Sequence, residues 1–329
     1  MSDNAAMQDE NAFLIDAFRR QLSETVTPAR IRGIERGEGA DALWNELYDT
    51  GFLDALVPEA SGGAGLTLAQ AFPLLMAAGE HAVPLPFAET MVARGLLVRH
   101  GAPAPQRAVI VLGGDTQQVP GGRFATHALV ERDGGGMLLR VTGDDLDVFG
   151  TGGCSSLDEG EVVARVPLPA GACQLAAAAV AAALMAGAMG RVLDMALRYA
   201  GARQQFGRAL GKFQAIQQQL AVLAQEVITA QVAARSAFVG QDFDPARVAA
   251  AKCRANEAAG AACNIAHAIH GAIGATQEFD LQLYTRRLKE WQIAFGSETY
   301  WAARLGRLRL AAQTATSADF LRQHLAHEE

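Results

Sequence analysis

A long stretch without charge most constrains what this chain can fold into. No charged residue occurs from Val166 to Gly190, and the helix-forming part of this stretch is mostly alanine and glycine. The stretch is long enough to span a bilayer, but Pro167, Pro169 and Gln174 interrupt it, and alanine and glycine are only weakly apolar. We therefore predict no membrane span here, but a helix that is buried on all sides in an oligomer core.

Helical periodicity dominates on both sides of this stretch. Apolar residues recur at three- and four-residue spacing in four segments near the N-terminus, which are 11–22, 39–50, 67–78 and 86–100. After Gly171 the same period returns and traces one face of a helix from Ile216 to Phe238. Further long helices are expected over Pro245–His270 and Leu281–Ala312.

The region from about Ala104 to Ala170 differs from its flanks. Short β-prone segments occur there, which are Val109–Leu112, Thr126–Glu131, Met137–Val141 and Glu161–Val166. Glycine-rich sequences at 113–114, 134–136 and 152–153 are expected to be hairpin turns. The fold is therefore predicted to be mainly α, with a helical N-terminal domain (1–103), a small middle β domain (104–170) and a C-terminal four-helix bundle (171–329).

Charge and cysteine usage narrow the functional class. Lys and Arg number 28 against 35 Asp and Glu, a net charge of −7, so a basic nucleic-acid-binding face is not expected. The cysteines form no CxxC pair or zinc-like cluster, and the acidic N-terminus is unlike a signal peptide. These features predict a cytoplasmic protein without a metal site. His267 and His270, three residues apart, are expected to be hydrogen-bonded in a helix and not metal ligands.

The most informative segment is Tyr199–Gln217, which reads YAGARQQFGRALGKFQAIQ. Arg203 offers a planar fork of donors that suits a pyrophosphate, and Phe206 offers a flat apolar face. Spacing alone, however, favours an ordinary surface arginine in a loop between helices. Two further motifs bear on this choice.

Trp44 opens the first of these motifs, a W-x-x-L sequence followed by G-F-L and V-P-E-A-S-G-G-A-G ending at Gly65. The second is I-H-G-A-I-G-A-T ending at Thr276, followed by Y-T-R-R-L-K ending at Lys289. Together with R-x-x-F-G from Arg203, these motifs resemble the acyl-CoA dehydrogenase family over nearly the whole chain. The resemblance implies a helical N-terminal domain, a middle β domain and a C-terminal four-helix bundle. It also implies FAD as cofactor and oxidation of an acyl-CoA thioester to the 2-enoyl form.

The family shares its flavin sites between subunits, which implies a set of cofactor contacts in this chain. The residues that would face an FAD bound mainly by a neighbouring subunit are Arg203, Gln205, Phe206, Leu210, Phe213, Gln214, Ile216, Gly271, Ser297 and Thr299.

The departures from the family pattern are equally informative. The middle region lacks the M-T-E-P-like and W-I-T-N-like segments that hold the flavin ring in full-length members. Phe295 occupies the slot of the usual catalytic glutamate, and the region 175–184, where a minority of members carry the base, has no carboxylate. A phenyl ring cannot accept a proton. Glu298 is the nearest substitute, because three residues further along a continuous helix it would lie beside the slot.

With these departures, the chain resembles the short subunit of α2β2 acyl-CoA dehydrogenases that act on CoA thioesters of steroid side chains. In that interpretation a larger partner supplies the catalytic glutamate, and an electron-transfer flavoprotein or a similar acceptor removes the electrons. One alternative is a self-sufficient homo-oligomeric dehydrogenase with Glu298 as base. Another is a flavin-free assembly subunit, against which the retained Arg203–Gly207 sequence argues.

Overall fold

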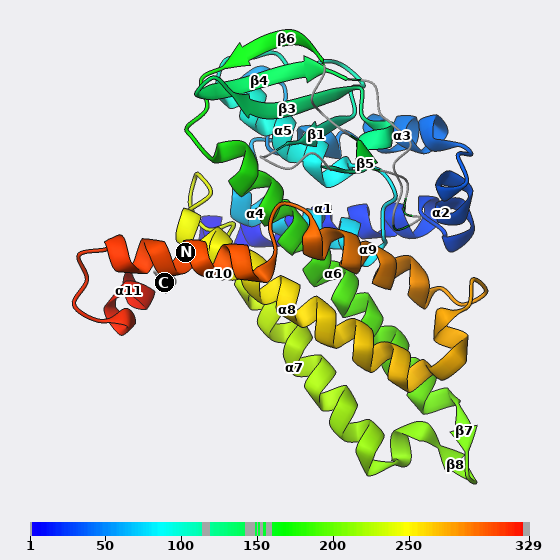
Figure 1. Cartoon of the computed structure of the whole chain (residues 1–329). Helices are drawn as coiled ribbons and strands as arrows, with labels where there is room; N and C mark the ends of the chain where they lie inside the picture. Colours follow the sequence, from blue (N-terminus) through cyan, green and yellow to red (C-terminus); the bar gives the residue numbers. More distant parts are fainter. Residues whose placement is uncertain are drawn as a thin grey trace.

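The computed structural model describes residues 2–113, 119–141, 149, 151, 154–155 and 160–324. The N-terminal part is helical, with α1 (Ser2–Thr25), α2 (Pro28–Glu35), α3 (Ala40–Asp49), α4 (Leu68–Glu80) and α5 (Phe87–Arg99). The strands that follow are β1 (Ile110–Leu112), β2 (Val119–Pro120), β3 (His127–Arg132), β4 (Gly135–Arg140), β5 (Cys154–Ser155) and β6 (Glu161–Val166). The C-terminal part holds α6 (Ala172–Ala202), β7 (Gln204–Gln205), β8 (Arg208–Ala209), α7 (Gln214–Ser236), α8 (Pro245–His270), α9 (Leu281–Ile293), α10 (Glu298–Ala311) and α11 (Ser317–His324). Figure 1 shows the sheet over the N-terminal helices at one end and the long helices extending away from it.

The uncharged stretch forms most of α6, the central helix of the molecule. It is the one described helix long and apolar enough to cross a membrane, and 89% of its most apolar window is buried within the protein. Helices α4, α7, α8 and α9 of the same chain pack around it. The prediction of a helix buried on all sides is thus confirmed, but the chain itself provides the burial and no oligomer is needed.

Two glycines allow α4 and α6 to cross at very short distance. A Cβ added at Gly187 would lie 1.9 Å from the carbonyl oxygen of Met76, and one added at Gly79 would lie 2.0 Å from that of Leu184. Real side chains never approach backbone so closely, so both positions require glycine. This crossing fixes the N-terminal helices on the bundle.

The main sheet has the strand order β1-β3-β4-β6. Strands β3 and β4 form the predicted hairpin, and Asp133 and Gly134 take the positive φ angles of 53° and 77° that its two-residue turn requires. Strand β1 runs parallel to β3, so the expectation of a hairpin turn after β1 at Gly113 is wrong. Parallel neighbours need a longer connection than a two-residue turn. Gly114 and the pair 152–153 lie outside the described residues.

Local sequence sets several helix ends. Thr67 and Gln70 form a reciprocal capping box at the start of α4. Asp244 caps α8 by accepting hydrogen bonds from the backbone N–H groups of Ala246 and Arg247, at 2.9 Å each. Pro245 then occupies the first helical position, where its missing N–H costs nothing. These signals explain why α8 has the bounds that the sequence predicts.

The expectation of one helix over Leu281–Ala312 is wrong. Helix α9 ends at Ile293 and α10 begins at Glu298, because Phe295 and Gly296 adopt φ angles of 59° and 109°. A right-handed helix cannot pass through two such residues. The hydrophobic period continues across the corner, which is why it did not reveal the break.

Candidate functional site

The Arg203–Phe213 segment forms a short protruding hairpin, β7–β8, at the far end of the bundle (Figure 1). Its base is closed by the Leu210 N–H, which donates to the Arg203 carbonyl oxygen at 2.9 Å. Phe206 and Gly207 form the tip with φ angles of 52° and 79°. The tip raises the Phe206 ring out of the protein, where it is 89% exposed.

The hairpin combines exposed cationic and aromatic groups. The Phe206 and Phe213 rings meet edge-on at 6.2 Å, and the Arg208 guanidinium lies 4.0 Å from the Phe213 ring centre. The Arg203 side chain is also exposed. An exposed guanidinium beside flat apolar rings can bind a planar group that carries a phosphate. This donor set therefore fits the pyrophosphate half of a dinucleotide cofactor.

Gly271 lies at the same end of the bundle as the hairpin. It ends α8 with φ 64°, and the preceding His270 stacks on Tyr199 of α6 with ring centres 4.6 Å apart. His270 Nδ1 also contacts the Ala266 carbonyl oxygen at 2.7 Å, and His267 Nε2 contacts Thr285 Oγ1 at 3.1 Å. Both histidines thus have the local hydrogen bonds expected of them.

Ser297 and Thr299 lie near the other end of α8. The adjacent Gly296 carbonyl oxygen contacts the Lys252 ammonium at 3.4 Å, eighteen positions before His270 on the same helix. At the helical rise, the two ends are about 27 Å apart. The structure therefore brings the hairpin and Gly271 together and leaves Ser297 and Thr299 apart. The ten residues expected to face an FAD thus form two groups, at the two ends of α8.

Phe295, which the family resemblance aligns with the usual catalytic glutamate, lies in the corner between α9 and α10. The Phe295 ring is buried, and its carbonyl oxygen accepts a hydrogen bond from Trp301 Nε1 at 3.0 Å. Glu298 is the first residue of α10, beyond the corner, so it does not follow Phe295 along a continuous helix. The geometric argument for Glu298 as a displaced base therefore fails at this corner.

Lys252 and Asn256 of α8 hold the α9–α10 corner through hydrogen bonds to its backbone carbonyl groups. The buried Lys252 ammonium donates to Asn256 Oδ1 at 2.6 Å and to the Trp291 carbonyl oxygen at 2.8 Å. Asn256 Nδ2 donates to the Gly296 carbonyl oxygen at 3.1 Å. Burial lowers the pKa of Lys252 to about 7, against the opposing effect of the Glu298 carboxylate. Carbonyls left without partners at the end of α9 are thereby satisfied.

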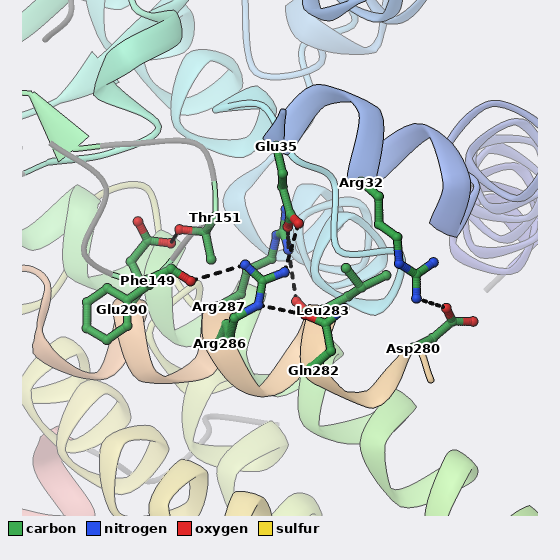
Figure 2. A network of polar contacts seen from close by, with 10 residues as sticks. All are labelled: Arg32, Glu35, Phe149, Thr151, Asp280, Gln282, Leu283, Arg286, Arg287 and Glu290. Atoms are coloured by element: carbon green, nitrogen blue, oxygen red, sulfur yellow. Dashed lines mark hydrogen bonds and ion pairs between the residues drawn. The ribbon is translucent and has the colours of Figure 1, made fainter. Parts of the chain in front are cut away.

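Figure 2 shows where α9 joins the N-terminal helices and residues 149 and 151. Glu35 of α2 accepts hydrogen bonds from Arg286 at 2.7 Å and from Arg287 at 2.8 Å. Arg286 also donates to the Phe149 carbonyl oxygen at 3.1 Å, and the Thr151 hydroxyl donates to Glu290 Oε2 at 2.8 Å. Arg32 of α2 pairs with Asp280 at 2.7 Å (Figure 2). One polar network thus ties three parts of the chain to α9.

A small cavity of about 30 Å³ lies beside this network. Glu89, Thr151, Arg287, Glu290 and Trp291 are among the residues that line it. One water needs roughly 10–15 Å³ on this measure, so the cavity holds two or three waters and neither an acyl chain nor a flavin ring. Sequence reasoning missed Glu35, Lys252, Glu89 and Glu290.

Glu89 makes the stability of the fold depend on pH. Burial raises the pKa of Glu89 from 4.5 to about 7, against its own backbone hydrogen bond, and the charge of Glu290 raises it further. The unfolded chain thus loses this proton near pH 4.5 and the folded chain near pH 7, so stability falls between these values as pH rises. We expect Glu89→Gln, relative to wild type, to gain roughly 3 kcal/mol of unfolding free energy between pH 4 and pH 8. Urea denaturation at both pH values measures the gain, with Glu59→Gln, at an exposed position, as control. The same difference in unfolding free energy between Glu89→Gln and wild type at pH 4 and at pH 8 would contradict this prediction.

Comparison with known proteins identifies the family. The acyl-CoA dehydrogenase N-terminal domain model matches residues 8–111, and the C-terminal domain model matches residues 174–309. The chain therefore belongs to the acyl-CoA dehydrogenase family, whose members are oxidoreductases with FAD as cofactor. This confirms the predicted family, the mainly α fold class and the cofactor.

Individual relatives are similar over most of their length. Acyl-CoA dehydrogenase IpdE2 of Mycobacterium tuberculosis is 30% identical, covering 82% of this chain and 90% of its own. IpdE2 of Mycolicibacterium smegmatis is 29% identical, with coverages of 85% and 93%. Among solved structures, a Tcur3481–Tcur3483 steroid ACAD variant matches with a TM-score of 0.82 and 25% identity, over 92% of this chain and 98% of that one. The ChsE4–ChsE5 complex from M. tuberculosis shares the fold, with a TM-score of 0.81, 24% identity and the same coverages.

Proposed function

We propose that this chain is the cofactor-completing subunit of a heteromeric acyl-CoA dehydrogenase that forms a 2-enoyl-CoA. The observation that carries the proposal is the contrast between two sites. The β7–β8 hairpin presents Arg203 and Phe206 to the outside, whereas Phe295, which the family resemblance aligns with the base, is a buried phenyl ring. The chain thus retains the groups that hold a cofactor and lacks the group that removes a proton.

The chemistry requires what this chain lacks. When bound, FAD accepts the β-hydrogen as hydride, while a carboxylate must remove the α-proton. Phe295 cannot do so, and Glu298 lies beyond the α9–α10 corner. The cavity at Glu89 and Glu290 is too small for an acyl chain. A larger subunit therefore supplies the base and the contacts to the flavin ring.

The cofactor contacts in this proposal come from one end of the bundle. Arg203 binds the pyrophosphate of an FAD held by the larger subunit, and Phe206 covers an apolar part of it. Gln205, Leu210, Phe213, Gln214, Ile216 and Gly271 surround this contact. Ser297 and Thr299, about 27 Å away along α8, are the proposed FAD contacts near the far end.

Similar proteins support the choice of partner and substrate. One similar structure is a Tcur3481–Tcur3483 steroid ACAD, and another is a ChsE4–ChsE5 complex. By analogy, the assembly is an α2β2 heterotetramer that acts on CoA thioesters of steroid side chains, and an electron-transfer flavoprotein or a similar acceptor reoxidises it. The proposal also includes three domains, which are a helical N-terminal domain (1–103), a middle β domain (104–170) and a C-terminal helical bundle (171–329). The last of these serves assembly.

Co-expression with a larger acyl-CoA dehydrogenase subunit tests this division of labour. We expect the chain alone to purify without stoichiometric FAD or turnover, and the complex to carry flavin absorbance and acyl-CoA oxidation. If the chain alone holds FAD and oxidises acyl-CoA, it is a self-sufficient dehydrogenase. A complex without flavin would identify it as an assembly subunit. Either result would overturn the proposal.

Arg203→Ala tests the cofactor contact itself. Losing charge-assisted hydrogen bonds to the pyrophosphate is expected to weaken FAD retention by the complex about 10- to 100-fold, measured by flavin fluorescence after dilution. The matched control is Arg198→Ala, five residues earlier on α6, whose exposed guanidinium pairs with Asp194. Equal FAD affinity in both variants would exclude Arg203 from the site.

A further inference from the structure

Helix α5 buries two charged side chains, Glu89 and Arg94, whose environments differ. They are 5% and 6% exposed. Arg94 Nε donates to Asp54 Oδ1 at 2.7 Å, so a direct ion pair neutralises its charge. Glu89 forms no ion pair with any residue that the structure describes. A carboxylate buried without a countercharge is costly, so such a group tends to bind a proton. Glu89 can therefore exchange a proton without breaking an ion pair.

The cavity of about 30 Å³ brings Glu89 together with two charged residues of α9, Arg287 and Glu290. These three are the charged residues among its described lining. The Arg287 guanidinium already pairs with Glu35 at 2.8 Å. Its Nη2 atom is buried and has no hydrogen-bond partner in the described part of the chain, so water in the cavity is expected to serve it. Glu290 is thus the charge that acts most directly on Glu89.

Glu290 also contacts Thr151, which comes from the middle region of the chain. The Thr151 hydroxyl donates to Glu290 Oε2 at 2.8 Å, and Figure 2 shows the two side chains pointing toward each other. Thr151 is itself buried, at 6% exposure. An ionised carboxylate is the stronger acceptor, because charge-assisted hydrogen bonds are roughly twice as strong as neutral ones. The Thr151 contact therefore favours a charged Glu290 and, through it, a proton on Glu89.

Ionisation of both carboxyl groups would place two like charges around one small cavity. Burial and, to a smaller extent, the charge of Glu290 raise the pKa of Glu89 from 4.5 to about 7, against its own backbone hydrogen bond. Helix α9 cannot easily move away, because two ion pairs join it to Glu35 of α2. The expected response to ionisation is a turn of the Glu290 side chain, which breaks its contact with Thr151.

We propose that Glu89 and Glu290 form a proton-controlled switch that attaches Thr151 to α9. With a proton on Glu89, Glu290 keeps its charge and holds the Thr151 hydroxyl. When Glu89 ionises, the Glu290 carboxylate turns away and its contact with Thr151 is lost. The attached state binds the Glu89 proton more tightly than the detached state, so rising pH favours detachment. The switch is independent of the function proposed above, since it needs neither cofactor nor partner.

Hydrogen exchange of the full chain tests the switch, read from the peptide that contains Thr151. Rates are corrected for the intrinsic effect of pH with an unfolded peptide of the same sequence. In wild type, protection of this peptide is expected to fall about tenfold from pH 5 to pH 9, the change expected when the pKa of one group differs by about one between two states. Glu89→Gln and Glu290→Gln each remove one of the two charges, so protection should then be equal at both pH values.

Matched variants separate the switch from general effects of pH. Glu59→Gln, at an exposed position, should keep the wild-type pH dependence. Thr151→Val removes the hydroxyl and should lower protection at both pH values, whereas Thr151→Ser should behave as wild type does. Peptides from α6 should remain the more protected ones at pH 9, which shows that the loss at Thr151 is local.

Two results would overturn the switch. Wild-type protection of the Thr151 peptide that is equal at pH 5 and pH 9 would show that the contact does not respond to the proton. A pH dependence that persists in Glu89→Gln would assign the proton to another group.

Discussion

Replacing Gly187 by alanine is expected to lower the free energy of unfolding by at least about 3 kcal/mol, because the added methyl would have to share space with the backbone of α4. The carbonyl oxygen of Met76 would lie 1.9 Å from the new Cβ, and the backbone nitrogen of Glu80 would lie 2.8 Å away. Neither atom belongs to a side chain that can rotate aside. The two central helices must separate, which opens the core along α6.

Gly201→Ala is the matched control for this prediction. Gly201 is in the same helix, but no atom lies within 4 Å of its added Cβ. Alanine is the better helix former by up to about 1 kcal/mol, so this variant is expected to be neutral or slightly more stable than wild type. Chemical denaturation of both variants measures the contrast, and similar unfolding midpoints for the two would disprove the close crossing.

Removing the Glu35 carboxylate is the second change with a large expected effect. Arg287 is buried, and Glu35 is its anionic partner at 2.8 Å. The Arg287 guanidinium also donates to the Leu283 carbonyl oxygen at 2.9 Å. Glu35→Ala leaves the guanidinium charge of Arg287 buried without that carboxylate. Breaking a buried pair in this way costs about 3–5 kcal/mol. We expect thermal unfolding of Glu35→Ala far below that of wild type.

Glu38→Ala controls for the loss of a surface charge. Glu38 is three residues away and pairs with Arg36, but both side chains are more than 60% exposed. Such a pair contributes at most about 1 kcal/mol. Combining Glu35→Ala with Arg287→Met should recover part of the lost stability, since the uncompensated charge is then removed as well. Absence of any recovery would indicate that Glu35 acts through packing and not through charge.

Much of the helical fold could be predicted from local sequence. The bounds of α8 follow from Asp244, Pro245 and Gly271, which are strong signals for the start and end of a helix. The hairpin between β3 and β4 follows from its glycine-rich turn. These predictions succeeded because each depends on neighbours in sequence, which the chain shows directly.

The α9–α10 corner could not be predicted in this way. Its glycine alone does not require a break, and the apolar period runs through it. The corner exists because Lys252 and Asn256, more than thirty-five positions earlier, satisfy the carbonyl oxygens that the break exposes. The same holds for Arg287, whose partner Glu35 is 252 positions away. Contacts of this range leave no pattern in a single sequence.

By itself, the sequence determined the family and the cofactor, because motif residues and their order record chemistry directly. The tertiary structure decided how these residues are grouped. It places the Arg203 hairpin and Gly271 at one end of α8 and Ser297 near the other. It also leaves one face of α7 exposed to solvent. The cavity that remains beside Glu89 has a volume of only about 30 Å³. Distances between residues far apart in sequence depend on how helices cross, and that is set by packing of the whole chain.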